Sequence, residues 1–250
     1  MLRIFLFIAL TISTQLVSAQ CDTRIEASSQ AELDAYNPCP EVDRVVLTGG
    51  NISDLSILQN IVSVSSILIS DCDELATVSF PNIINISDLA IADCDNLIEV
   101  NGFNSVLGNE FDFELIVDLN SNPRLDRVEI FQNYSESKPF SIAITDTNIS
   151  IFDSFNKVDT IGFCYFEGNT TLPVFQNVKH ILELTVLDYK QQQIDFNISF
   201  PELMSINDFW LLSSDSLLEV SNWGRLRQMG TINIQDNPLL NIVSLSLIHI

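Results

Sequence analysis

The apolar and polar positions of this chain recur with a period of about 22 to 28 residues. The clearest example lies between Ile67 and Val100, where the phrase apolar-x-apolar-x-x-Cys-x-x-Leu occurs twice and ends at Leu75 and Leu97. A recurrence of this length predicts a solenoid, because one coil cannot bury its apolar face until a neighbouring coil stacks on it.

With the last residue of the phrase taken as an anchor, the whole chain divides into successive coils. Each apolar-x-apolar pair predicts a short strand that pairs in parallel with the strands of the coils before and after it. A small polar residue, such as Asn122 or Asn169, marks the bend, where we expect it to turn inward and bond backbone groups. The anchors are Ile52, Leu75, Leu97, Leu125, Ile149, Leu172, Ile194, Leu217 and Leu240.

After each anchor, apolar residues continue at every third position, as in Leu97, Val100 and Phe103. A period of three indicates an extended or 3₁₀-like return path rather than an α-helix. The pattern therefore predicts an all-β solenoid with short parallel strands along one face and about eight to nine rungs. At about 4.8 Å per rung it would be roughly 40 Å long.

The first 19 residues have the features of a secretory signal. Arg3 precedes an apolar run from Ile4 to Ile12, and small residues lead to a cleavage site after Ala19. A membrane anchor is the alternative, but the apolar run is too short to span a bilayer. Lipid attachment at Cys21 is a second alternative. The rest of the sequence has no uninterrupted apolar run long enough to span a membrane.

The five cysteines fall into two types. Cys21 and Cys39 bracket a segment whose Ser28-Ser29 and Ala31-Glu32-Leu33 suit a short capped helix, and a disulfide between them would stabilise the fold by about 3 kcal/mol. Cys72 and Cys94 share one repeat position on successive coils, where either a strained disulfide or two buried thiols can form. Cys164 falls at an apolar position, and no cysteine spacing suggests a zinc site.

These features predict four segments along the chain. A signal peptide (1–19) precedes a disulfide-bracketed N-terminal cap with a small helix (20–40), and a solenoid follows (41–244). The last six residues (245–250) match one reading frame of a common sequencing-library adapter, so we expect a truncated fragment with a non-native tail. The stretches 102–114, 134–139 and 189–200 are insertions, which can project from the solenoid and bind ligands; simple tolerance of extra loop length is the alternative for each of them.

The cysteine-bracketed start, followed by Val45-Val46-Leu47-Thr48-Gly49 and by coils of this phrase, resembles the receptor L-domain. That family is the leucine-rich-repeat-like, right-handed β-helix of the insulin and epidermal growth factor receptors, and the likeness covers about residues 21 to 244. In those receptors, L-domains help bind peptide hormones. The resemblance implies an extracellular module, but no ligand-contacting residue carries over, because such residues lie outside the repeat phrase.

Charge narrows the classes of partner. The chain has 33 acidic against 11 basic residues and a net charge of −22, which disfavours nucleic acid and anionic membranes as partners. Six N-x-S/T sequons occur. Five of them, at Asn51, Asn85, Asn133, Asn148 and Asn197, are possible N-glycosylation sites, whereas the sixth, at Asn169, is expected to point inward.

Few residues suggest specific chemistry. Asp71 and Asp73, repeated one coil later as Asp93 and Asp95, are a weak candidate for a Ca²⁺ site, and solvated turns are the alternative. His180 is expected to lie at the rim of a return path. Trp223 falls on the three-residue apolar pattern and should be buried, whereas Trp210 alternates with buried positions and can face outward as a platform for sugars.

We therefore expect a secreted or cell-surface module without catalytic activity or cofactor, which binds an extracellular protein or glycan through its solenoid face or inserted loops. A β-helical carbohydrate-active enzyme, a lyase or hydrolase, is the alternative, because such enzymes arrange carboxylates and basic residues along a groove. A purely structural surface protein is the third possibility. No G-x-S-x-G or H-E-x-x-H motif occurs.

Overall fold

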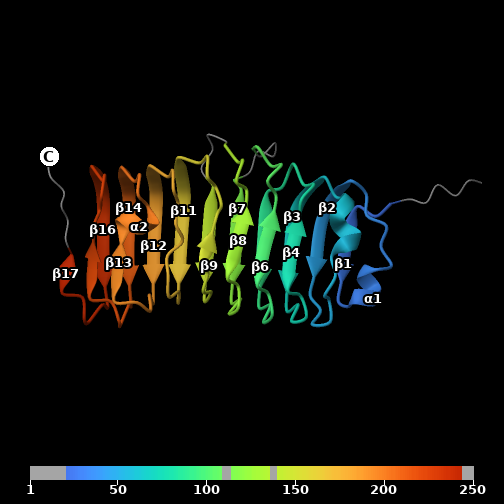
Figure 1. Cartoon of the computed structure of the whole chain (residues 1–250), viewed down its shortest axis with the longest axis horizontal. Helices are drawn as coiled ribbons and strands as arrows, with labels where there is room; N and C mark the ends of the chain where they lie inside the picture. The colour runs from blue at the N-terminus through green and yellow to red at the C-terminus, as the bar shows by residue number, and fades with distance from the viewer. Residues whose placement is uncertain (1–20, 109–113, 136–139, 244–250) are drawn as a thin grey trace, which may run out of the picture.

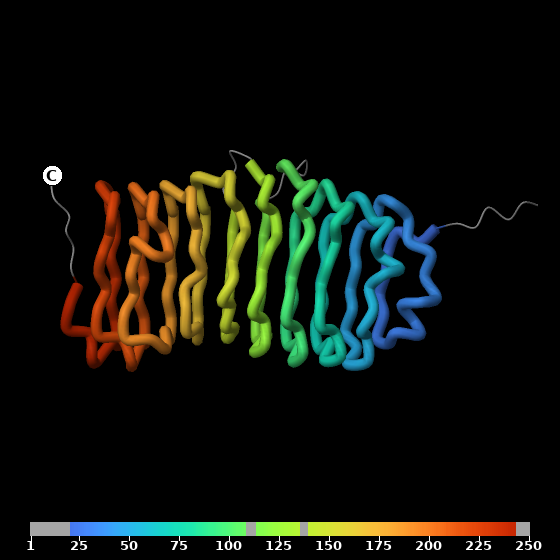
Figure 2. The backbone as a smooth tube through the Cα atoms, in the orientation of Figure 1, coloured from blue at the N-terminus to red at the C-terminus, as the bar shows by residue number. Residues whose placement is uncertain are grey.

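A computed structural model describes residues 21–108, 114–135 and 140–243. The chain winds into a solenoid of about nine turns, and the described N- and C-terminal ends lie at opposite ends of its long axis (Figure 1). Figure 2 shows coils of similar size stacked along that axis. The prediction of an all-β solenoid is confirmed. The predicted signal peptide and the predicted non-native tail lie outside the described residues.

One long parallel sheet of ten strands forms a face of the solenoid. Successive coils contribute its strands, so chain order and sheet order agree. The strands are β1 (Arg24–Ala27), β2 (Glu41–Leu47), β3 (Ser63–Ser70), β5 (Asp88–Ala92), β7 (Ile116–Asn120), β9 (Ser141–Thr145), β11 (Thr160–Glu167), β12 (His180–Leu187), β14 (Ser205–Leu212) and β16 (Gln228–Gln235).

The return paths also pair in parallel, which the sequence pattern did not predict. A four-stranded sheet contains β4 (Thr77–Phe80), β6 (Glu99–Gly102), β8 (Arg127–Ile130) and β10 (Ile151–Phe152). A separate three-stranded sheet contains β13 (Gln193–Asp195), β15 (Glu219–Ser221) and β17 (Ile242–Val243). The helices are short: α1 (Gln30–Leu33), the 3₁₀ helix η1 (Ser56–Asn60) and α2 (Phe196–Ser199).

Burial follows the predicted register except in the last coil, where Ile232 is exposed and the anchor Leu240 is half-buried. The apolar series after Leu97, Leu125 and Leu217 are buried in a single core that runs the length of the solenoid. Ile194, however, pairs with Val220, which lies three residues after the anchor Leu217. The anchor position of the seventh coil is therefore the exposed Gln191, and the assignment of Ile194 as an anchor was wrong.

Two features hold the bend that follows each long strand. The first bend residue adopts the left-handed conformation, with φ of 53° at both Asp71 and Asp93, a conformation that aspartate tolerates better than most residues. The next residue turns inward. At Asn122, the side-chain amide accepts a hydrogen bond from Cys94 N (3.2 Å) and donates to Ile91 O (2.9 Å), so it ties its coil to the preceding one.

Asn169 and Asn237 repeat this arrangement. Asn169 Oδ1 accepts from Thr147 N (3.1 Å), and Asn237 Oδ1 accepts from Ser214 N (2.9 Å). The predicted inward bend amides are confirmed. Since the backbone groups they satisfy have no strand partner at the bend, these amides replace ladder hydrogen bonds that the turn removes.

Aromatic rings stack at the opposite bend. Phe80, Phe103, Phe131 and Phe155 lie at one corner of four successive coils, with ring centroids 5.1 to 5.5 Å apart. The last three have φ between 52° and 56°, a left-handed conformation that is unfavourable for a bulky residue. Burial of each ring against the next offsets that cost.

The N-terminal end is closed by the predicted cap. Cys21 and Cys39 form a disulfide, and Ser29 caps α1 by accepting a hydrogen bond from Glu32 N. The Glu32 carboxylate accepts hydrogen bonds from Ser28 N and Oγ, which lower its pKa and tie the helix to the residue that precedes its N-cap. Strand β1 lies within this cap and pairs with β2, so stacking begins before residue 41.

Replacement of a bend amide tests this account. We expect Asn122→Ala to lower the free energy of unfolding by about 1–3 kcal/mol, because it leaves Cys94 N unpaired in a buried bend and removes one donor each from Ile91 O and Asn120 O. Asn207→Ala, at an exposed position of β14, should change it by less than about 0.5 kcal/mol. Equal urea midpoints for the two variants would contradict the proposed role of the bend amide.

Candidate functional site

The outer face of the long sheet carries a group of large apolar side chains on β11, β12 and β14. We call this group the aromatic patch; it consists of Phe163, Tyr165, Leu187, Trp210 and Leu212, all half-buried. The equivalent outward positions of β5 and β9 carry small residues, among them Ala90 and Ala143. Strands with small outward residues therefore separate the aromatic patch from Val46 and Leu68, the half-buried apolar residues at the equivalent positions of β2 and β3.

Strand register sets the geometry of the aromatic patch. Tyr165 pairs with Thr185, and Thr185 pairs with Trp210, so the two aromatic residues are two rungs apart, roughly 10 Å. The rings of Phe163 and Tyr165 are nearly parallel, with centroids 6.2 Å apart. Thr185 is almost fully buried between its neighbours. The prediction that Trp210 faces outward is confirmed.

Acidic groups surround the aromatic patch. Tyr165 donates a hydrogen bond to Glu167 (2.6 Å), and burial, together with this bond, raises the pKa of Tyr165 to about 12. Glu183 and Asp208 are neighbours on the adjacent rungs, in register with Phe163. A surface that combines exposed aromatic rings with carboxylates suits neutral or basic ligands better than acidic ones.

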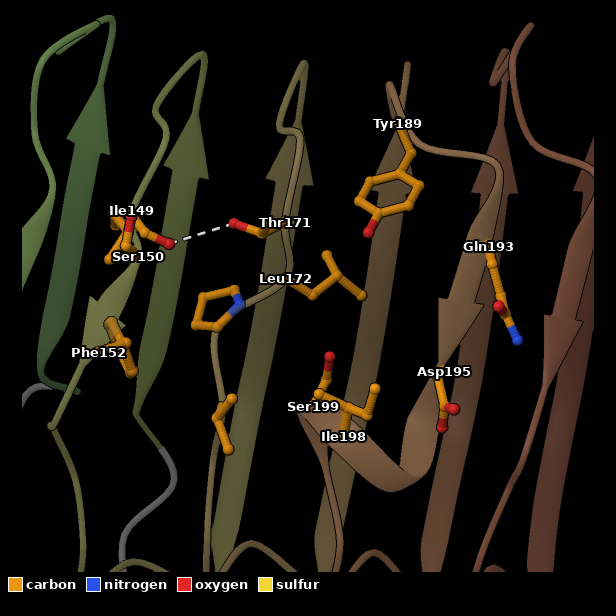
Figure 3. A pocket seen from close by; sticks show the side chains of 12 residues that line it. Ile149, Ser150, Phe152, Thr171, Leu172, Tyr189, Gln193, Asp195, Ile198 and Ser199 are labelled. Carbon is orange, nitrogen blue, oxygen red and sulfur yellow. Dashed lines mark hydrogen bonds between the residues drawn. The ribbon is translucent and has the colours of Figure 1, made fainter.

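A groove of about 510 Å³ lies on the return side, between β10 and β13 (Figure 3). Ser150 and Phe152 line one wall, Gln193 and Asp195 line the other, and Leu172 lies between them. Figure 3 shows Tyr189 at one end and Ile198 and Ser199 of α2 at the other. The groove is thus built where the two return sheets fail to join.

Few charges lie in the groove. Among the described residues that line it, none is basic and one is a carboxylate, Asp195, which accepts hydrogen bonds from Asn197 N and from Asn222 Nδ2. Tyr189 is nearly buried, and that burial raises its pKa to about 12, so its hydroxyl stays protonated near neutral pH. The groove offers neutral donors and acceptors around an apolar floor.

The aspartates of the weak Ca²⁺ candidate do not converge. Asp71, Asp73, Asp93 and Asp95 are exposed, and Asp71 and Asp93 are the left-handed residues of the bends. Within the described ranges, no group of three or more His, Cys, Asp or Glu side chains is placed to hold a metal ion. The solvated-turn interpretation of these residues is therefore the one that the geometry supports.

Substitutions at Asp93 separate these two interpretations. Asp93→Asn should leave the free energy of unfolding within about 0.5 kcal/mol of wild type, whereas Asp93→Val should lower it by about 1–2 kcal/mol, because a β-branched residue fits the left-handed conformation poorly. We expect millimolar Ca²⁺ to leave the urea midpoint unchanged. A Ca²⁺-dependent shift in wild type that Asp93→Asn abolishes would restore the metal site.

The remaining residues of interest have structural roles. Trp223 is buried and stacks on Phe196, with ring centroids 4.0 Å apart, as the apolar pattern predicts. His180 begins β12 instead of lying on a return path, and its Nδ1 lies 2.8 Å from Ser205 Oγ.

The three cysteines outside the disulfide are free and fully buried. Of the two alternatives for Cys72 and Cys94, the structure contains thiols. A hydrogen bond between these two thiols, and then burial, raise the pKa of Cys94; burial raises that of Cys164.

The sequon asparagines differ in exposure. Asn51, Asn148 and Asn197 are exposed, whereas Asn85 and Asn133 are half-buried. Asn169 is buried, and its Nδ2 donates to Ile144 O (2.6 Å).

In a host that glycosylates such sequons, we expect glycan at Asn51 or Asn148 and none at Asn169. A glycan on Asn169 would open a buried bend and leave backbone groups unpaired, at about 1–3 kcal/mol each. Mass mapping of glycopeptides measures the occupancy of each site. Full occupancy at Asn169 in folded material would contradict the inward bend at that coil.

Comparisons with protein-family models, with curated proteins and with solved structures found no match for this chain. Within the described parts of the chain, no helix has the length and apolar character needed to cross a bilayer.

Proposed function

We propose that this protein is a secreted or cell-surface recognition module of the receptor L-domain type, which binds an extracellular protein or glycan without catalysis. Its ligand lies on the outer face of the long sheet. The observation that supports this function is the aromatic patch, because half-exposed aromatic rings on a rigid surface are typical of recognition sites.

The geometry of the patch favours a rigid, extended contact. Ten paired strands fix the backbone at Tyr165 and Trp210, so little backbone ordering opposes binding. Their separation of roughly 10 Å lets one ligand contact both rings at once. The net charge of −22 and the neighbouring carboxylates favour a neutral glycan or a basic protein surface as the ligand.

The enzyme alternative has less support. Glycoside hydrolases commonly use a pair of carboxyl groups, whereas among the described residues that line the groove Asp195 is the only carboxylate, and both of its oxygens accept hydrogen bonds. Recognition is therefore the function that the described residues support best.

Alanine substitutions in the patch test this function. The secreted protein would be screened against immobilised neutral glycans and extracellular proteins, and Trp210→Ala and Tyr165→Ala should each weaken binding at least 10-fold, because aromatic anchors commonly dominate an interface. Ile98→Ala is the matched control, since Ile98 is an exposed apolar residue of the return side. Binding that survives both patch substitutions, or no binding by the wild type, would contradict the proposal.

A further inference from the structure

The sixth coil lacks the return strand that its neighbours have. Strand β10 of the fifth coil ends the four-stranded sheet, and β13 of the seventh coil begins the three-stranded sheet. The two strands occupy equivalent positions in their coils, since Ile151 pairs with Arg127 and Gln193 pairs with Glu219, each the second residue after an anchor position. One rung is therefore missing from a return sheet that would otherwise be continuous.

Pro173 explains the missing rung. In other coils, the residue after the anchor donates its N–H to the carbonyl of the preceding coil, as Ile98 does to Ala76 and Ser150 does to Asp126. Pro173 occupies this position after Leu172 and has no N–H to donate. Among the described residues, no backbone hydrogen bond connects 172–174 with β10 or β13.

The sixth coil is also displaced inward. The residue after the anchor is exposed at Ile98, Asp126 and Ser150, whereas Pro173 is buried. Residues 172–174 thus form the floor of the groove, and the edges of β10 and β13 form its walls. Among the described residues, no backbone group pairs with the edge of β10 or of β13 that faces the groove.

The backbone N–H of Gln193 is the clearest example, in the described part of the chain, of an unpaired group at these edges. The second residue after the anchor donates its N–H to the preceding coil at Glu99, Arg127, Ile151 and Glu219. At Gln193, the equivalent residue of the seventh coil, the described residues provide no such acceptor. This N–H points into the groove from β13.

We propose that the groove binds an extended peptide segment of a partner protein, which supplies the missing strand between β10 and β13. The two walls are two rungs apart, roughly 10 Å, so a strand between them would lie about 4.8 Å from each edge. Strand addition of this kind uses main-chain hydrogen bonds for affinity. The peptide would run parallel to both strands and join the two return sheets.

The groove also sets the chemistry of the segment. The segment needs free backbone N–H groups, so it has no proline at the paired positions. Leu172 and Pro173 favour an apolar residue over the floor, and Asp195 and the net charge of −22 disfavour acidic residues. A glycan is the less suitable occupant, because the walls present backbone donors and acceptors at strand spacing. This site is separate from the aromatic patch, and it does not depend on the function proposed for that patch.

The probe is a six-residue peptide, acetyl-Lys-Thr-Val-Ser-Val-Lys-amide, titrated into the full chain while hydrogen exchange is followed at the amide of Gln193. We expect saturable binding and slower exchange at this amide. The same peptide with N-methyl groups on both valines keeps its side chains but loses two donors, and it should bind at least 10-fold more weakly. Equal affinity of the two peptides would overturn the proposal.

Two variants locate the site. Pro173→Val restores the missing N–H, so the sixth coil can form its own strand; this should weaken peptide binding at least 10-fold and slow exchange at Gln193 without peptide. Pro123→Val makes the same change at an exposed bend and should bind as wild type. Gln193→Pro removes the wall donor at a strand edge, where proline is tolerated, and should also weaken binding.

Three further results would test whether the groove binds a peptide. Wild-type binding by Pro173→Val and Gln193→Pro, or no binding at millimolar peptide, would overturn the proposal. Protection of the Gln193 amide by cellohexaose, with none by the peptide, would assign the groove to a glycan instead. Trp210→Ala should leave peptide binding unchanged. The proposal for the groove and the proposal for the aromatic patch can therefore be refuted independently.

Discussion

Every part of this fold depends on hydrogen bonding between one coil and the next. A single coil would leave the edges of its strands unpaired and its apolar anchor residue exposed to water, so it would not be stable without a neighbouring coil. Stacking at a spacing of about 4.8 Å satisfies both requirements at once. It also places each residue against its equivalent in the neighbouring coils, which is why Phe103 lies on Phe131 and why Cys72 and Cys94 are adjacent.

The bends between strands are the least favourable part of each stacked coil. A bend interrupts the strand ladder, so its backbone groups need other partners, and its residues must adopt conformations that strands do not use. Asp93 and Asn122 show the two solutions: a residue that tolerates a left-handed conformation, and an amide that bonds the preceding coil. At the opposite bend, phenylalanines adopt the same unfavourable conformation because their rings are buried against one another.

The features that could be predicted from sequence are those with a local pattern. The anchors, the inward amide of Asn169, the buried Trp223 and the outward Trp210 all follow from a repeat phrase and the alternation of strand residues. Pairing of the return paths could not be predicted, because a three-residue apolar period fits extended and 3₁₀ conformations equally. The prediction of Ile194 as an anchor was wrong because the residues that follow Tyr189 are polar, so no apolar residue marks the true anchor position.

Pro173 was open to prediction in principle, since it stands directly after an anchor, but its effect depends on which N–H groups the return paths use. The long sheet explains why the defect is tolerated. Strand β11 of the sixth coil pairs with β12 from Thr160 to Glu167 and with β9 from Phe163 to Glu167, so this coil stays in place without a return strand. In a solenoid each coil contacts only its neighbours, and the loss therefore stays local. One face can remain a regular sheet while the other has a gap, so the two proposed binding surfaces can share a single core.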